Sequence, residues 1–347
     1  GFTEQRFLRD PGSLVTNGPF QLERAGASGF RLRTSEAYHG RAAVRLSGVE
    51  YVRADSFRMA QLLVAAGRAD VMAPVTPGAP TALPTDRCLT EESEMAMVVT
   101  AMDLNVTREP LRDLRVRQAL ALAMDRAGSI RESDAGRMVP AYAWVPDMPG
   151  RAGLNLLEEN ADAARRLLAE AGYPGGKGFP VLIMPVSVRD ANYDYWQAWT
   201  ERWHRELGIR TYLAFQTEEE RKQCLKSGDY DVYPSGLIAT VPDAGDMLGA
   251  FALPEIFSGT RWDSPEIKHL LAEANNTTGA ERLVQLEQVE RLAMEAVPTI
   301  PMMFERRRTL LAIEVDGWYA DPLGRQALKR LAIRPLRDGE PVGGDPL

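Results

Sequence analysis

The chain has few of the residues that build metal and redox centres. Among its 347 residues are two cysteines, Cys88 and Cys224, and three widely separated histidines, His39, His204 and His269. The cysteines match no metal-binding or redox spacing. An oxidising compartment would permit a disulfide between them, and two inert thiols are the alternative. We therefore expect no metal and no cofactor.

Sequence signatures of common enzymes are also missing. The chain has no nucleophile elbow, phosphate loop, dinucleotide fingerprint or HExxH motif. The glycine cluster at residues 175 to 178 lies between an expected helix and an expected strand, whereas a phosphate loop leads from a strand into a helix. Carboxylates are plentiful, but their spacing cannot show that two of them face one substrate. We expect a protein that is not an enzyme, and a hydrolase stays as a rival hypothesis.

Excess positive charge and long apolar runs are absent as well. The net charge of −7 argues against binding to nucleic acid or anionic lipid. The one basic run, residues 306 to 308, is expected to be the solvated end of a strand or loop. No window approaches the roughly 18 apolar residues of a membrane span. Residues 1 to 13 lack the apolar core of a signal peptide, so we expect that any export signal has been removed. A hydrophobic content of 45% allows two globular domains.

The clearest helix signal covers residues 111 to 130. Apolar residues recur there at helical spacing and predict one continuous buried stripe: Val116, Ala119, Leu120, Ala123, Met124 and Ala127. Asp113 precedes the stripe and suits the N-cap, and Gly128 is placed to end the helix in a left-handed turn.

The N-terminal region reads as β-rich. Strands are expected near residues 20 to 22, 30 to 33 and 44 to 52. Asp55 should then cap a helix that runs to Ala66, and a short strand should follow at 70 to 72. The loop at 74 to 84, or the strand at 95 to 104, is the natural domain boundary.

Residues 160 to 236 predict a βαβαβ unit. Asn160 suits the cap of a first helix, Trp196, Trp199 and Trp203 stripe a second, and Thr217 with Glu220 forms a capping box for a third. The intervening strands, 179 to 186, 209 to 215 and 230 to 233, should be parallel. Ligands collect beyond the carboxyl ends of such strands, which selects the loops at 185 to 192, 216 to 217 and 236 to 246. The tryptophan stripe is better explained as core than as a binding platform.

The remaining elements are simpler. Ser264 and Pro265 should open a helix, a second helix should run to Ala296, and strands should follow at 300 to 304 and 331 to 333. Residues 337 to 347 are expected to be a disordered tail. Between prolines at 140 and 146, Tyr142 and Trp144 lie on an extended connector. They either pack into the core or line a pocket.

Several short motifs occur together in the order typical of one protein family. The strongest is the run from Pro110 to Arg126, and the others lie at residues 17–20, 67–71, 161–173, 207–209, 229–232, 262–267 and 297–301. Together they resemble the peptide, dipeptide and nickel class of extracytoplasmic solute-binding proteins, which serve ATP-driven ABC importers. The resemblance covers roughly residues 12 to 336.

This resemblance implies an α/β fold of the periplasmic-binding-protein-like class II type, with two lobes of mixed sheets flanked by helices. Family members begin well upstream of the motif at 17–20, so an incomplete first lobe is expected, formed by residues 1–97 plus 316–336. Residues 98–315 would form the second lobe. The family's mechanism implies closure about a hinge near 97–105 and 312–318, around a small solute or short peptide held between the lobes.

The resemblance also implies partners and a location. The protein would deliver its ligand to the transmembrane subunits of an ABC permease, in the periplasm or another extracytoplasmic place, associated with the membrane through the transporter. We expect a monomer that binds no nucleic acid. A solute-sensing domain of a regulator is the alternative, although no amino-terminal helix-turn-helix is visible.

The expected ligand-binding residues combine the connector, the strand-end loops and this resemblance: Tyr142, Trp144, Asp190, Tyr193, Leu237, Ile238, Thr240, Asp243 and Asp246. In oligopeptide-binding members of the family, an aspartate shortly after a Gly-Trp pair receives the peptide's amino group. Here Leu237 stands in the place of the tryptophan and Thr240 in that of the aspartate. A peptide ammonium would lack its counter-charge unless Asp243 or Asp246 substitutes.

Overall fold

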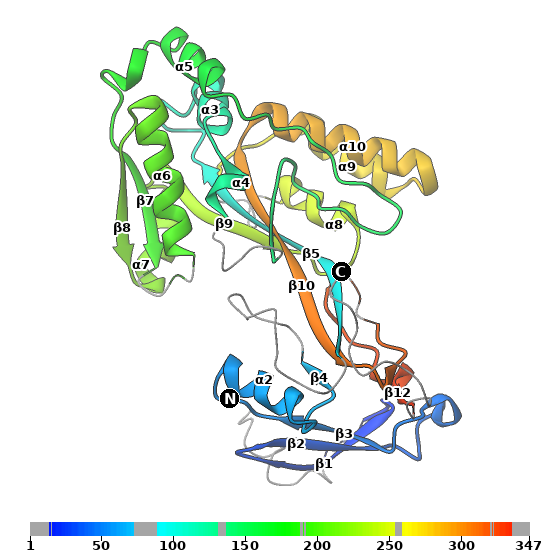
Figure 1. Cartoon of the computed structure of the whole chain (residues 1–347). Coiled ribbons are helices and arrows are strands. Elements are labelled where there is room, and N and C mark those ends of the chain that lie inside the picture. Colours follow the sequence, from blue (N-terminus) through cyan, green and yellow to red (C-terminus); the bar gives the residue numbers. More distant parts are fainter. Residues whose placement is uncertain are drawn as a thin grey trace. The chain divides into compact units, whose positions relative to one another are not determined.

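The computed structural model describes residues 14, 16–72, 89–130, 137–187, 190, 192–253, 259–319, 321 and 323–334, without the side chains of 57, 58, 89–94 and 308. The chain divides into two compact units, Gly1–Glu94 with Arg307–Leu347, and Met95–Arg306. These boundaries fall within the two longest strands, β5 (Leu89–Leu104) and β10 (Thr299–Ala312) (Figure 1). The expected lobe limits at 97/98 and 315/316, and the hinge, stay predictions.

The first unit is built on a small antiparallel sheet. Its strands β1 (Phe20–Gly26), β2 (Gly29–Thr34) and β3 (Gly48–Val52) lie in sequence order. Gly29 allows the close approach of β2 to β3, because a Cβ there would lie 1.9 Å from the Tyr51 carbonyl oxygen. A 3-10 turn, η2 (Arg41–Ala43), connects β2 to β3.

The helix α2 (Phe57–Ala65) is capped by Ser56 rather than by Asp55, because the Ser56 hydroxyl accepts from the Met59 amide. The predicted strand at 70 to 72 is present as β4 (Val71–Met72), which pairs with the end of β10. Near the C-terminus, β11 (Val315–Asp316) pairs with β12 (Ala332–Ile333), and η6 (Leu328–Arg330) precedes β12.

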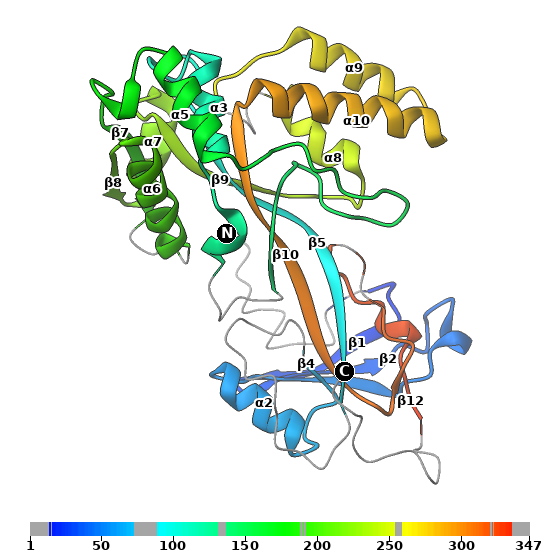
Figure 2. The same cartoon turned by 45° about the horizontal axis from the view of Figure 1, so that its top comes forward.

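In the second unit, β5 and β10 form the sheet together with β9 (Val232–Ile238), in the order β10-β5-β9, and β6 (Met138–Pro140) pairs with β10. The helices α9 (Pro265–Asn275) and α10 (Gly279–Ala296) pack against each other, as Figures 1 and 2 show. Ser264 caps α9 as expected, through its hydroxyl and the Ile267 amide.

The predicted βαβαβ unit is correct for its first two strands and wrong for its third. β7 (Leu182–Ser187) and β8 (Thr211–Gln216) are parallel and form a sheet of their own. The third strand, β9, instead joins the larger sheet and runs antiparallel to β5, from Val98 opposite Ile238 to Leu104 opposite Val232. Next to β7, hydrogen bonds come from Asp231, just before β9, whose amide donates to the Ile183 carbonyl oxygen at 2.9 Å and whose carboxylate accepts the Ile183 amide at 2.8 Å. The longer ladder with β5 decides the sheet.

The single helix predicted within residues 111 to 130 is two helices, α3 (Leu114–Leu122) and α4 (Arg126–Ser129). Asp113 caps α3 as expected, accepting from the Arg115 amide at 2.9 Å. The predicted left-handed turn at Gly128 is wrong, because Gly128 lies inside α4. The Asp125 carboxylate caps the start of α4 by accepting a hydrogen bond from the Gly128 amide. Ala127 is therefore exposed rather than part of the buried stripe.

The tryptophan stripe lies in the core, as predicted. On α6 (Tyr193–Leu207), Trp196, Trp199 and Trp203 are at most 2% exposed. The Trp203 Nε1 atom donates to the Leu120 carbonyl oxygen at 2.9 Å and so ties α6 to α3. The three tryptophans pack in one cluster with α3, β7 and α5 (Ala161–Glu170).

The local helix ends also agree with the sequence. Asn160 caps α5, and Thr217 and Glu220 form the capping box of α7 (Glu218–Ser227). The short elements η4 (Pro174–Gly176), α8 (Ala244–Gly249) and η5 (Ala250–Ala252) complete the unit.

The expected cysteine pair and the expected C-terminal tail are only partly covered by the described residues. Cys224 is a free, buried thiol whose Sγ donates to the Asp229 carbonyl oxygen at 3.2 Å, whereas Cys88 and the expected tail at 337–347 lie outside the described residues. Within the described ranges, no helix has the length and apolar character needed to cross a membrane.

Candidate ligand-binding site

The end of β9 presents an apolar surface. Leu237 and Ile238 are the last residues of β9 and pair with Val99 and Val98 of β5. Ile238 is 69% exposed and Val241, in the loop that follows, is 48% exposed. Exposed aliphatic side chains held by a paired strand are a suitable surface for an apolar ligand group.

The loop after β9 is fixed from inside by Asp246. One carboxylate oxygen, Oδ2, accepts from the Thr240 and Val241 amides at 2.6 Å and 3.3 Å. The other, Oδ1, accepts from the Thr240 hydroxyl at 2.9 Å. Thr240 and Asp246, predicted separately as ligand contacts, are therefore partners of each other.

Asp243 has a different partner, from a distant part of the sequence. It is the N-cap of α8, accepting from the Gly245 amide, and it pairs with both terminal nitrogens of Arg282 at 2.8 Å and 2.6 Å. The hydrogen bonds from Arg282 hold the pKa of Asp243 below its usual range. Sequence reasoning missed Arg282, because nothing local marks this first-turn residue of α10 as a partner of a loop 39 positions away.

Trp144 is only 1% exposed and contacts α8. Its Nε1 atom donates to the Met247 carbonyl oxygen of α8 at 3.0 Å, and its ring packs on Phe251 with the centroids 5.2 Å apart. The structure thus packs Trp144 against α8 and η5, the elements that follow the loop after β9. Direct ligand contact by Trp144 stays a prediction.

Tyr142, two residues earlier, forms a second group. Its ring is half-buried, and the Arg126 guanidinium lies 5.5 Å from the ring centroid. Arg126 is itself 1% exposed and is held by the Pro301 carbonyl oxygen and by Glu159. Tyr142 therefore lies beside a buried cation rather than beside the loop after β9.

Asp190 and Tyr193 form a third group at the start of α6. The Asp190 carboxylate accepts from the Asn192 amide at 2.8 Å and from Trp196 Nε1 at 2.9 Å. The Tyr193 ring packs on Phe215 with a centroid distance of 5.2 Å. Asp190 thus contacts the start of α6, and Tyr193 joins α6 to β8. A role of either residue in ligand binding stays a prediction.

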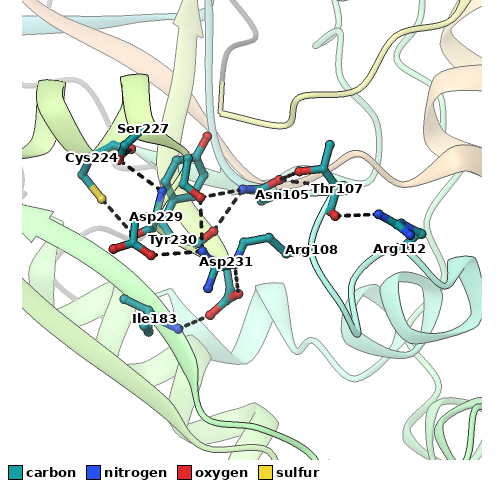
Figure 3. Close-up of polar contacts among 11 residues, drawn as sticks. Asn105, Thr107, Arg108, Arg112, Ile183, Cys224, Ser227, Asp229, Tyr230 and Asp231 are labelled. Atoms are coloured by element: carbon teal, nitrogen blue, oxygen red, sulfur yellow. Dashed lines mark hydrogen bonds and ion pairs between the residues drawn. The ribbon is translucent and has the colours of Figure 1, made fainter.

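A polar network elsewhere in the unit comes from two of the sequence motifs (Figure 3). Arg108 bonds Asp229 at 3.1 Å and Asp231 at 3.0 Å, and Asn105 donates to the Tyr230 carbonyl oxygen at 3.1 Å. With the Asp231 link to Ile183, this network joins the loop before α3 to both sheets. Its polar groups bond one another, so we interpret it as a structural brace.

A cavity of about 500 Å³ lies among α3, α5, α10 and residues 155 to 158, and none of the nine predicted ligand residues lines it. Its lining mixes apolar side chains such as Leu122, Leu167 and Met294 with the polar Gln118 and Arg291. Within the described residues, no group of three or more His, Cys, Asp or Glu could hold a metal ion.

Comparison with known proteins defines the class. Residues 4–258 match the family described as bacterial extracellular solute-binding proteins, family 5, middle part. Because the match covers more than half of the chain, the chain belongs to this family.

Individual relatives agree with this assignment. The chain is 24% identical over 308 residues to the oligopeptide-binding protein OppA of Bacillus subtilis, covering 84% of this chain and 56% of the relative. It is 23% identical over 341 residues to the dipeptide-binding protein DppE of the same organism, covering 93% and 61%. The chain thus spans little more than half the length of these relatives.

Solved structures show the same fold. HbpA2 from Haemophilus parasuis superposes with a TM-score of 0.77 at 19% identity, over 92% of this chain and 64% of that one. A periplasmic oligopeptide-binding protein from Borrelia burgdorferi gives 0.69 at 22% identity, over 95% and 67%. The expected periplasmic-binding-protein-like α/β fold is confirmed.

Proposed function

We propose that this chain is the solute-binding component of an ABC importer, and that it binds a short peptide or a related small solute at the end of β9. The family assignment supports the solute-binding role, and relatives named for oligopeptide and dipeptide binding support the ligand class. Delivery to the transmembrane subunits of a permease, and a periplasmic or other extracytoplasmic location, rest on the same relatives.

One structural observation carries the choice of site. Ile238 and Val241 are exposed aliphatic side chains on a segment that is fixed on both sides, by the Asp246 contacts to Thr240 and by the Asp243–Arg282 pair. A fixed apolar surface loses little conformational entropy when a ligand covers it. The site thus combines exposure with rigidity, which the buried Trp144 and the self-contained Asp190 group do not.

Calorimetric titration of the 347-residue chain with short peptides, opines and metal chelates tests this proposal. Ile238→Asp should weaken the binding of any ligand found by about tenfold or more, because it places a charge against the ligand's apolar group. Val284→Asp is the matched control, since Val284 is 65% exposed on α10. Absence of binding across the panel, or equal affinities for the two variants, would refute the proposed site.

The sequence also left a hydrolase as a less favoured rival, and the comparisons do not support it. It is separated by incubating the chain with the same peptides, and with esters, and following product formation by mass spectrometry. The solute-binding proposal expects every compound to be recovered intact, and turnover that Ile238→Asp abolishes would favour the hydrolase.

A further inference from the structure

We infer that the free edge of β8 pairs with the same strand of a second copy of this chain, so that the β7-β8 sheets of the two copies become continuous. Such a dimer is independent of the ligand site proposed above, and it departs from the monomer expected from the family resemblance. Three features of β8 support it: an open backbone edge, a sequence without protecting residues, and side chains whose order is complementary to itself.

One edge of β8 is open in the part of the chain that the structure describes. β8 pairs with β7 alone, and Figures 1 and 2 both show it as the outer strand beside β7. The Leu182 amide donates to the Arg210 carbonyl oxygen, so the backbone groups of every second residue from Arg210 onward face β7. Those of Thr211, Leu213 and Phe215 therefore face outward, and no hydrogen bond joins them to another described element.

The sequence of β8 has none of the features that usually keep an open edge unpaired. Its residues, TYLAFQ, include no charge, no proline and no glycine, and its register with β7 is regular along its whole length. The edge strand β1, by contrast, carries Glu23 and Arg24 and has an irregularity between Leu22 and Arg24. Charges, prolines and bulges protect edges because an unprotected edge pairs readily with other strands. β8 is therefore suited to receive a partner strand.

An antiparallel pair centred on Leu213 matches the side chains of two copies. Leu213 lies at the two-fold axis, opposite the same residue of the second copy. Tyr212 then lies opposite Ala214 of the second copy, which sets a large side chain against a small one, and Thr211 lies opposite Phe215. In this register the outward backbone groups of the two strands face one another and can form about six hydrogen bonds. The strand is thus complementary to itself.

Exposure and charge agree with this register. Tyr212 and Phe215 are 62% and 57% exposed, so a strand laid along the edge would cover part of both rings. Arg210 is exposed just before β8, and Glu218 and Glu219 are exposed in the first turn of α7, just after it. Antiparallel pairing brings the basic end of one strand beside the acidic end of the other, because Arg210 is a diagonal neighbour of Glu218 of the second copy.

Analytical ultracentrifugation of the intact 347-residue chain tests the pairing. From about 10 µM to about 1 mM, we expect a concentration-dependent equilibrium between monomer and dimer, because one pair of strands makes a small interface. Tyr212→Lys should weaken dimerisation about tenfold or more, since it removes the ring and places a charge in an uncharged interface. Val284→Lys is the matched control, at a site 65% exposed on α10. A monomer at every concentration, or equal dimerisation of the two variants, would overturn the inference.

Cysteine cross-linking tests the register. Tyr212→Cys and Ala214→Cys are made as separate chains and mixed under a mild oxidant. Position 212 of one copy should face position 214 of the other at a Cα distance of about 4.5 Å, so the mixture should form a disulfide-linked dimer. Neither variant alone should do so, because like positions would lie about 7–8 Å apart. The unmodified chain controls for Cys88 and Cys224. Equal cross-linking by a single variant, or none in the mixture, contradicts the proposed pairing.

Discussion

The buried ion pair between Arg151 and Glu290 should be a main support of the connector that carries Trp144. Their side chains are 2% and 0% exposed and bond directly, and the other Glu290 oxygen accepts the Val145 amide at 2.7 Å. Glu290→Gln keeps the size of the side chain and an acceptor for Val145, but leaves the Arg151 guanidinium without a counter-charge. Removing one partner of a buried pair typically costs about 3–5 kcal/mol, so we expect a loss in that range.

Urea titration followed by tryptophan fluorescence measures this loss. Five of the six tryptophans, at positions 144, 196, 199, 203 and 262, lie in the unit that contains the pair. The double variant Arg151→Met/Glu290→Gln removes the unpaired charge and should recover most of the stability. Asp162→Asn is the exposed control, since its carboxylate pairs with Arg165 while 79% exposed, and it should cost at most about 1 kcal/mol.

The reasoning would be refuted in either of two ways. Glu290→Gln could cost no more than the exposed control, which would mean that water reaches Arg151. Alternatively, the double variant could be as unstable as the single one, which would show that packing, rather than the unpaired charge, causes the loss.

Other perturbations give distinct results. In urea titration, Asp113→Ala should cost about 1 kcal/mol as the lost cap of α3, and Leu120→Ala, in the core, about 2–5 kcal/mol; the reverse order would contradict their placement. Trp203→Phe should cost about 1–3 kcal/mol, because it leaves the buried Leu120 carbonyl without its donor, and no measurable loss would dismiss that bond. Burial raises the pKa of Asp103 from 3.8 to about 6, so the folded protein holds this proton more tightly than the unfolded chain. Stability present below pH 4 should therefore fall by about 2–3 kcal/mol as the pH rises through 6. Asp103→Asn should flatten that slope, and equal slopes would contradict the assignment.

Local signals in the sequence were reliable where the physical interaction is itself local. Asn160, Thr217 with Glu220, and Ser264 cap the helices that they were expected to begin, because a side chain and an amide three positions later meet in almost any tertiary setting. The tryptophan stripe was recognisable as core for a similar reason, since its helical spacing already places the three rings on one face.

Prediction of the candidate site was less complete. The residues of the 237–246 segment were predicted to bind ligand from the family resemblance and from the expectation of a loop after a strand at 230 to 233, and their ligand contact stays a prediction. Their partners were not predicted, because Arg282 reaches Asp243 across 39 positions and Trp144 reaches Met247 across 103. Sequence spacing carries no record of such contacts. The same limit applies to Asp246, which looked available to a ligand until its bonds to Thr240 were visible.

By itself the sequence determined most of the helix caps, most of the buried stripes, the parallel pairing of β7 with β8 and, through its ordered motifs, the family. Only the tertiary structure decided that β9 pairs with β5 and that the helix predicted within residues 111 to 130 is divided into α3 and α4. The choice between two sheets depends on which distant strand offers the longer ladder, here from Val98 to Leu104. The second helix places the Arg126 guanidinium in the core, where its partners, Glu159 and Pro301, lie 33 and 175 positions away. Periodicity reports which face of a segment is buried, and it cannot report what that face is buried against.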